Sequence, residues 1–173
     1  MTREYPADGA DAFPRPPRTV TDRDGHEVTL SAADAVDREA LVAMYLDFDP
    51  ADRAQGIPPV KEAAIEKWLD NILDEDCVNV VARHDGRVVG HATLVPDRHG
   101  EHELAIFVLQ AFQGSGNGTA LLETLLGAGQ AAGIERVWLT VERWNDSAIA
   151  LYKKVGFETG NTESFEIEMS IRL

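Results

Sequence analysis

The feature that most constrains the fold is a glycine-rich stretch between an apolar run and an apolar helix. The segment "FQGSGNGTALLETLL" (residues 112–126) has glycine at 114, 116 and 118 and follows "HELAIFVL". Glycine inside a helix costs about 1 kcal/mol relative to alanine, so these glycines predict a turn between a strand and a helix. Such a turn lets backbone approach a ligand, and the unpaired N–H groups of the helix's first turn favour an anion. The same residues also suit a plain turn or close helix packing.

Two common phosphate motifs do not fit this stretch. It contains no Gly-Lys-Ser/Thr of the nucleoside-triphosphate type. No GxGxxG follows the first expected strand with an acidic residue about 20 positions later, as dinucleotide binding requires. A glycine loop that binds another phosphate ligand in an interaction module stays an alternative.

A second motif gives the glycines a more specific interpretation. Residues 113–118, "QGSGNG", match Q/R-x-x-G-x-G/A, and residues 145–158, "NDSAIALYKKVGFE", match Asn-x-x-Ala-x-x-Leu-Tyr-x-x-x-Gly-Phe. In this order and at this spacing the chain resembles the GCN5-related N-acetyltransferase (GNAT) family. The stretch "ELAIFVLQAFQGSGNG" with "FDPADRAQGIPP" is similar to protein-lysine acetyltransferases and also to acetyltransferases for small amines.

Periodicity and the resemblance together predict the fold class. Two β-branched runs flank Asp85-Gly86, a dipeptide typical of a tight hairpin. We expect one α/β domain over residues 23–173, after a flexible tail at 1–22 or an arm that orders against a partner. The resemblance implies a mixed central sheet flanked by helices, with strands four and five splayed. The expected helices are 35–48, 60–76, 118–133 and 146–155, and the expected strands begin near 26, 78, 87, 102, 136, 157 and 164.

The resemblance also implies which residues bind acetyl-CoA as co-substrate. The pantetheine arm pairs with main-chain atoms of one strand, the pyrophosphate lies on the glycine loop, and an asparagine bonds the coenzyme arm. The corresponding residues are Ile106, Phe107 and Val108; Gln113, Gly114, Ser115, Gly116, Asn117, Gly118 and Thr119; and Asn145. Members of the family often have arginine or lysine in this loop, and this chain has none there, so Arg143, Lys153 or Lys154 are candidates for the 3′-phosphate.

Two catalytic roles follow from the chemistry of acetyl transfer. Tyr152 lies in the second motif, and the resemblance places it near the thioester sulfur as the acid for the leaving thiolate. The attacking amine must be neutral, and Glu103 is our first candidate for its base, with Glu101 and Glu142 as rivals. The alternatives are a core tyrosine and solvated glutamates. The histidines form no convincing metal site, so we expect no metal.

Charge and cysteine content limit the function further. The net charge is −14, with 30 acidic and 16 basic residues, which disfavours binding to nucleic acid or to an anionic membrane and favours a cationic acceptor. An acidic, lysine-poor surface also suits a high-salt cytoplasm. The single Cys77 forms no internal disulfide, and no segment has signal-peptide or membrane-spanning character, so we expect a cytoplasmic protein. The family resemblance leaves a homodimer and a non-catalytic acyl-CoA sensor open.

Overall fold

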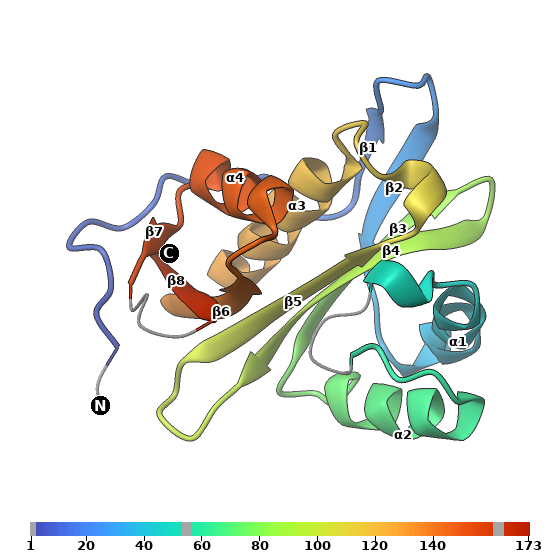
Figure 1. The fold of residues 1–173 in the computed structure, drawn as a ribbon, viewed down its shortest axis with the longest axis horizontal. Coiled ribbons are helices and arrows are strands. Elements are labelled where there is room, and N and C mark those ends of the chain that lie inside the picture. Colours follow the sequence, from blue (N-terminus) through green and yellow to red (C-terminus); the bar gives the residue numbers. More distant parts are fainter. Residues whose placement is uncertain (1–2, 53–56, 161–164) are drawn as a thin grey trace.

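One mixed sheet organises the chain in the structure, which is a computed structural model that describes residues 3–52, 57–160 and 165–173 (Figure 1). The described residues form an eight-stranded sheet in the order β1-β2-β3-β4-β5-β6-β8-β7. Only the pair β5–β6 is parallel. The strands are β1 (Arg18–Thr21), β2 (Glu27–Ala32), β3 (Val78–His84), β4 (Arg87–Pro96), β5 (His102–Val108), β6 (Arg136–Glu142), β7 (Glu158–Thr159) and β8 (Glu166–Arg172).

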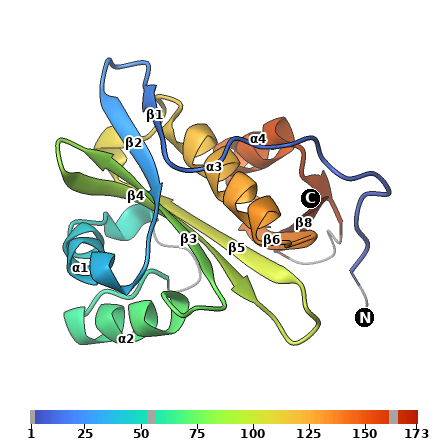
Figure 2. The same ribbon diagram turned by 180° about the vertical axis from the view of Figure 1, so that it is seen from behind.

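Helices cover both faces of this sheet (Figures 1 and 2). Leu121 packs over Gly90 of β4, since a Cβ built on Gly90 would lie 3.1 Å from the Leu121 side chain. The next residue of β4, His91, is hydrogen-bonded to Tyr45. Because neighbouring strand residues point to opposite faces, the helices that hold Leu121 and Tyr45 lie on opposite sides of the sheet. The helices are α1 (Arg38–Leu46), α2 (Glu62–Ile72), α3 (Asn117–Ala131) and α4 (Asp146–Val155), with 3₁₀ turns at Ala35–Asp37, Pro50–Asp52 and Gln110–Phe112. In the described residues no helix is both long and apolar enough to cross a bilayer.

The β3–β4 hairpin confirms the turn predicted at Asp85-Gly86. Both residues have positive φ, 49° and 79°, as a two-residue turn of this hand requires. The strands pair from His84 with Arg87 to Val78 with Leu94, with an irregularity after Ala82. This hairpin places β4 beside β5, the strand that leads into the glycine loop.

The N-terminal segment differs from the prediction. Residues 18–21 were expected to belong to a flexible tail, but they form strand β1, which pairs antiparallel with β2. The proline-rich sequence before them has no periodicity, and this hid the strand.

The residues before β1 also pack on the chain's own domain. The Ala10 N–H donates to the Arg172 carbonyl of β8 at 2.7 Å, and the Phe13 N–H donates to Gln130 Oε1 of α3 at 2.8 Å. Figure 2 shows this segment, in blue, running across α3. A Cβ on Gly127 would lie 2.0 Å from the carbonyl oxygen of Pro14, so glycine is required for this close approach. The segment is therefore packed on its own chain.

A fully buried polar chain connects α1, β4 and β3. The Tyr45 hydroxyl lies 2.6 Å from His91 Nδ1, His91 Nε2 lies 2.7 Å from Asn79 Oδ1, and Asn79 Nδ2 donates to the Ile72 carbonyl. The Asn79 oxygen can only accept, so His91 Nε2 carries the hydrogen and Nδ1 accepts from Tyr45. Burial lowers the pKa of His91 to about 3, which keeps its ring neutral. These bonds satisfy both ring nitrogens.

Candidate functional site

The parallel strands β5 and β6 separate after a short contact. They pair only at His102 with Val137 and at Glu103 with Trp138, although β5 continues to Val108. From residue 104 onward, β5 keeps its other neighbour, β4, but has no strand partner on the β6 side among the described residues. The predicted splay is therefore present, between the fifth and sixth strands because β1 adds one to the count.

The main-chain groups that face this opening follow from the register of β4 and β5. The Leu109 N–H donates to the directly opposite Val89 carbonyl at 2.9 Å, so alternate residues from Leu109 backward bond to β4. Phe107 belongs to that set and directs its N–H and carbonyl to β4. The residues between, Ile106 and Val108, direct theirs toward β6. Of the three residues predicted to pair with the pantetheine arm, Ile106 and Val108 therefore direct main-chain groups into the opening, whereas the main-chain groups of Phe107 face β4.

Backbone conformation explains two of the three glycines of the loop. Gly114 and Gly116 have φ values of 71° and 95°, which side chains with a Cβ rarely adopt, and a Cβ on either would meet nothing within 4 Å. Gly116 is the N-cap of α3, and no side chain caps this helix end. The first N–H groups of α3 are therefore available to an anion at an open surface. A Cβ on Gly118 would lie 3.5 Å from Leu151 of α4, an ordinary contact, so packing does not require glycine at this position.

The polar side chains of the loop point into the protein. Ser115 and Asn117 are 2% and 3% exposed, and both donate to the Phe112 carbonyl, at 3.2 and 3.1 Å. Gln113 is exposed, and its Nε2 donates to the Val108 carbonyl at 2.9 Å and to Asp52 at 3.0 Å. The donor groups of both side chains are thereby used inside the protein, which leaves main-chain N–H groups as the donors that an anion at the loop would meet.

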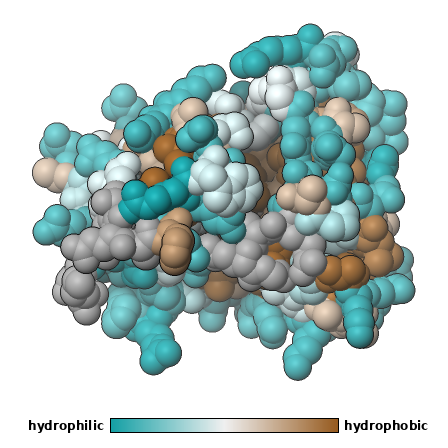
Figure 3. All heavy atoms as spheres, viewed as in Figure 1, coloured by the Kyte–Doolittle hydropathy of each residue, from teal (hydrophilic) through white to brown (hydrophobic). Residues whose placement is uncertain are grey.

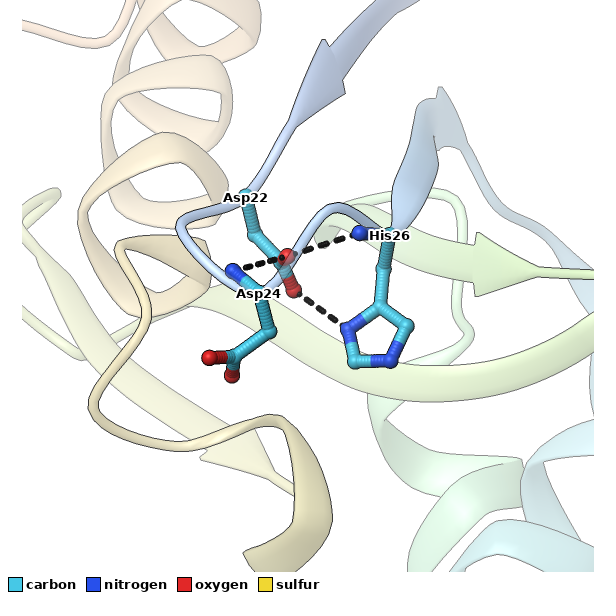
Figure 4. A group of neighbouring side chains, drawn as sticks. All are labelled: Asp22, Asp24 and His26. Carbon is cyan, nitrogen blue, oxygen red and sulfur yellow. Dashed lines mark hydrogen bonds and ion pairs between the residues drawn. The ribbon is translucent and has the colours of Figure 1, made fainter.

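Asp22 lies behind the loop and is a residue that the sequence analysis missed. Its Oδ2 accepts from Asn117 Nδ2 at 2.9 Å and from Ser115 Oγ at 3.5 Å. Its Oδ1 accepts from the main-chain N–H groups of Asp24 and His26, each at 2.9 Å (Figure 4). Burial by itself raises the pKa of Asp22, but the hydrogen bonds outweigh it and hold the pKa well below its usual range. Asp22 is therefore a charged anchor under the loop.

Asp22, Asp24 and His26 also lie close enough to hold a metal ion, with ligand atoms within 4.8 Å of one another. Figure 4 shows that the Asp24 carboxylate points away from the His26 ring. His26 Nδ1 is already 2.9 Å from Asp22 Oδ2, so the bonds within this turn account for the cluster without an ion. We assign no metal to it.

The second motif forms the start and body of α4. Asn145 is the N-cap, and its Oδ1 accepts from the Ala148 N–H and from Ser147 Oγ, both at 3.3 Å. The cap leaves the Nδ2 group for other contacts. Tyr152 is 9% exposed, its ring is 5.8 Å from Phe157, and its hydroxyl has no hydrogen-bond partner among the described residues. Burial raises the pKa of Tyr152 to about 12, so the hydroxyl keeps its proton at neutral pH.

Of the three candidate bases, Glu103 lies where the strands part. Glu103 is the last residue of β5 to pair with β6, and burial raises the pKa of its carboxyl. Glu101 precedes β5 rather than continuing it, is 4% exposed, and forms an ion pair with Arg3 at 3.7 Å. Glu142 ends β6, opposite Glu166 of β8. Position and a raised pKa therefore favour Glu103.

A cavity of about 500 Å³ beside Glu103 adds residues that the sequence analysis did not select. The Arg3 guanidinium lies 3.5 Å from the centre of the Trp138 ring, and Trp138 Nε1 donates to Asp97 at 3.0 Å. Arg3 also pairs with Glu168 at 3.3 Å. Trp138 alternates with buried residues along β6, and this alternation was the available sign that it faces away from the core. Hydrophilic side chains cover most of the face in Figure 3.

The comparison with known families decides the identity of this arrangement. The sequence model of the acetyltransferase (GNAT) family matches residues 38–157. The chain belongs to this family. It is 36% identical over 141 residues to an uncharacterized N-acetyltransferase of Mycobacterium tuberculosis, covering 80% of this chain and 90% of that one. The predicted family and enzyme class, an N-acetyltransferase, are confirmed.

Solved structures agree on the fold. The GNAT domain of S. lividans PAT has a TM-score of 0.80 at 20% identity, covering 91% of this chain and 97% of that one. A phosphinothricin acetyltransferase from Sinorhizobium meliloti, solved in complex with AcCoA, has a TM-score of 0.69 at 25% identity, over 84% of this chain and 88% of that one. The predicted α/β fold with a mixed, helix-flanked sheet is confirmed.

Proposed function

We propose that this GNAT acetyltransferase moves the acetyl group of acetyl-CoA directly to a primary amine within a ternary complex. The observation that supports this most is the opening between β5 and β6, which runs into the uncapped N-terminus of α3. An extended amide-containing arm ending in a pyrophosphate fits that sequence of an unpaired strand and an anion-binding loop. The AcCoA complex of the Sinorhizobium meliloti relative is consistent with this co-substrate.

In this proposal each part of the coenzyme meets a distinct part of the chain. Ile106 and Val108 offer main-chain groups to the pantetheine amides, as a neighbouring strand would. The N–H groups of the loop from Gly114 to Thr119 hold the pyrophosphate, helped by the dipole of α3. The Nδ2 of Asn145 donates to the coenzyme arm, while its Oδ1 caps α4. Gln113 lies between the pantetheine and pyrophosphate sites, because its side chain donates to the main-chain carbonyl of Val108.

The chemistry removes two protons from the acceptor nitrogen and supplies one to the sulfur. The amine attacks the thioester carbonyl only when neutral, and Glu103, whose raised pKa makes it a stronger base, takes the first ammonium proton directly or through water. Attack forms the C–N bond of a tetrahedral intermediate. As this collapses, the C–S bond breaks, the Tyr152 hydroxyl protonates the leaving thiolate, and the second proton of the nitrogen passes to the tyrosinate, directly or through water, which restores the hydroxyl. The high pKa of Tyr152 ensures that its proton is present beforehand.

The net charge of −14 favours a cationic acceptor, either a protein lysine or a small amine. Near Glu103, the carboxylates of Asp97, Glu101 and Glu168 are all paired with the chain's own Arg3, so this attraction comes from the charge of the whole chain. The cytoplasmic location, the adaptation to high salt and the homodimer stay predictions from the sequence.

Release of free thiol from acetyl-CoA in the presence of a panel of amines tests the proposal. The panel should contain lysine-containing peptides, polyamines and neutral-side-chain amino acids. We expect thiol release with at least one cationic amine and thermal stabilisation by acetyl-CoA but not by ATP or NAD. Stabilisation without thiol release across the panel would identify an acyl-CoA sensor instead, and stabilisation by ATP or NAD alone would identify a different phosphate ligand.

A further inference from the structure

The turn between β1 and β2 lies against the glycine loop, although about 90 residues separate them in sequence. The Arg23 N–H donates to the Ser115 carbonyl at 3.0 Å, and Asp22 binds the side chains of Ser115 and Asn117. The GNAT family match begins at residue 38, so this turn lies outside the part of the chain that the family model matches. The contact thus joins the glycine loop to a segment that precedes the matched region.

Turn and loop together enclose a cavity of about 270 Å³ at the N-terminus of α3. Arg23 borders it from the turn and Lys154 from α4, while Gly116 and Thr119 contribute the loop and the first turn of α3. Two carboxylates also border this cavity, Glu123 of α3 and the buried Asp22, so the formal charges of its lining balance. The Asp22 carboxylate is turned onto its own hydrogen-bond donors, so the cavity joins the uncapped N–H groups of α3 to two exposed cations.

The rim cations are available to a ligand. Arg23 and Lys154 are exposed, and neither side chain has an ion pair within the described part of the chain. The glycine loop has no cation of its own between 113 and 118. The Oδ1 of Asn117, which is 3% exposed and also borders the cavity, has no hydrogen-bond partner in the same part of the chain. An unpaired amide oxygen at this place can accept from a ribose hydroxyl or from water.

We propose that the β1–β2 turn completes the coenzyme phosphate site, with Arg23 and Lys154 binding a phosphate group of acetyl-CoA and Asp22 positioning the glycine loop. This inference rests on the proposed use of acetyl-CoA. The glycine loop has no cation of its own, and in this proposal Arg23 of the β1–β2 turn and Lys154 of α4 supply the cationic contacts. The phosphate is either the pyrophosphate or the ribose 3′-phosphate, both of which offer the oxygens that a guanidinium prefers.

Asp22 acts through the loop rather than on the ligand. Its two oxygens accept from Asn117 and Ser115 on one side and from its own turn on the other. These bonds draw both polar side chains inward, so that the loop presents main-chain N–H groups outward. A carboxylate so close to an anion site would repel a ligand if it were free, but here its charge is taken up by the donors around it. Asp22 is therefore a positioning residue.

Calorimetric binding of CoA and of 3′-dephospho-CoA, without any acceptor, tests Arg23. We expect Arg23→Ala to weaken CoA binding about five- to tenfold, with a smaller loss at high salt. Arg15→Ala is the matched control, because Arg15 is an exposed arginine of the same N-terminal segment and lies on the stretch that packs near the far end of α3. A loss that disappears with 3′-dephospho-CoA assigns the 3′-phosphate, and a loss that persists assigns the pyrophosphate.

If Arg23→Ala binds CoA as tightly as Arg15→Ala and the parent do, the proposed role of Arg23 is wrong. That result leaves the proposed function intact, since the parent still binds CoA. If the parent itself does not bind CoA, the proposed use of acetyl-CoA fails first, and the two failures are thereby distinguished.

Asp22→Ala and Asp22→Asn test the positioning role. We expect the CoA dissociation constant to rise about tenfold or more for alanine and less for asparagine, which keeps one acceptor oxygen. The KM of the amine at saturating acetyl-CoA should stay within about twofold of the parent, and hydrogen exchange at residues 115–119 should accelerate. A folded variant with the parent's CoA affinity, or one that changes both substrates equally, contradicts the role. If Asp22→Ala does not fold, Asp22→Asn decides by the same measurements.

Discussion

Two buried tyrosines on opposite faces of the sheet differ in what their hydroxyls do. Tyr45 of α1 is 3% exposed and donates to His91 at 2.6 Å, in a chain of bonds that continues to Asn79. Tyr152 of α4 is 9% exposed, yet no described residue pairs with its hydroxyl. Burial raises the pKa of both. A bonded hydroxyl stabilises the fold, whereas the Tyr152 hydroxyl has no partner in the described part of the chain and is not fully enclosed, so it is available to a substrate.

The largest expected effect comes from removing the hydroxyl of Tyr152. Tyr152→Phe keeps the ring and its packing on Phe157, so acetyl-CoA should bind as before while kcat falls about 100-fold or more. Stability should change little, because this hydroxyl makes no bond to the described residues. Thiol-release kinetics with the best acceptor and a thermal melt measure both. If Tyr152→Phe retains full kcat, Tyr152 has only a structural role, as Tyr45 does.

The same substitution at Tyr45 should have the opposite outcome. Tyr45→Phe leaves His91 Nδ1 buried without its donor, which costs about 1–3 kcal/mol of the free energy of unfolding. For a chain of this length each kcal/mol lowers the melting temperature by about 2–4 °C. We expect kcat within about twofold of the parent. A variant as stable as the parent would show that the bond to His91 contributes nothing.

Acid should destabilise the protein through His91. Its pKa is lowered from 6.5 to about 3 in the fold, so between these values the unfolded chain binds a proton that the folded chain excludes. Above pH 6.5 the ring is neutral in both the folded and the unfolded chain, so His91 does not lower stability there. As the pH falls below 6.5, stability decreases by up to about 1.4 kcal/mol per pH unit until pH 3. Denaturant melts of the parent and of His91→Gln from pH 7 to pH 4 should show a shallower slope for the variant.

The sequence alone predicted what depends on local pattern. The glycines at 114 and 116 predicted a turn between a strand and a helix, Asp85-Gly86 predicted the hairpin, and the two motifs predicted the family. These features need only neighbouring residues.

The residues that sequence analysis missed all depend on contacts between distant segments. Asp22 lies 95 positions from Asn117, and Arg3 lies 135 positions from Trp138. Asp22 stands among many acidic residues in this chain, and nothing in its local sequence separates it from a solvated one. The use of Phe107 also depended on tertiary structure, because only the register with β4 shows which main-chain groups of β5 are free.

The smallest and most pH-dependent effect concerns Glu103, which handles the attacking amine rather than the leaving thiolate. Burial raises its pKa, opposed by Arg3 and reinforced by Asp97 and Glu166. Glu103→Gln removes the base without changing the side chain's size. Because an amine increasingly deprotonates itself as pH approaches its own pKa, the deficit of the variant should shrink at high pH. At pH below the pKa of Glu103 the parent also loses its base, and the two rates should converge again.

The deficit should therefore be greatest between the pKa of Glu103 and that of the amine, where we expect about tenfold. Profiles of kcat/KM against pH for the parent, Glu103→Gln and Glu142→Gln measure it, with Glu142→Gln as the matched glutamate at the other end of β6. Tyr152→Phe should lower the rate across the whole range, since its hydroxyl is protonated throughout. A parent-like profile in Glu103→Gln together with a deficit in Glu142→Gln would identify Glu142 of β6 as the base. Parent-like profiles in both variants would leave Glu101 or water as the base, and Tyr152 as the only side chain of the proposed pair that transfers a proton.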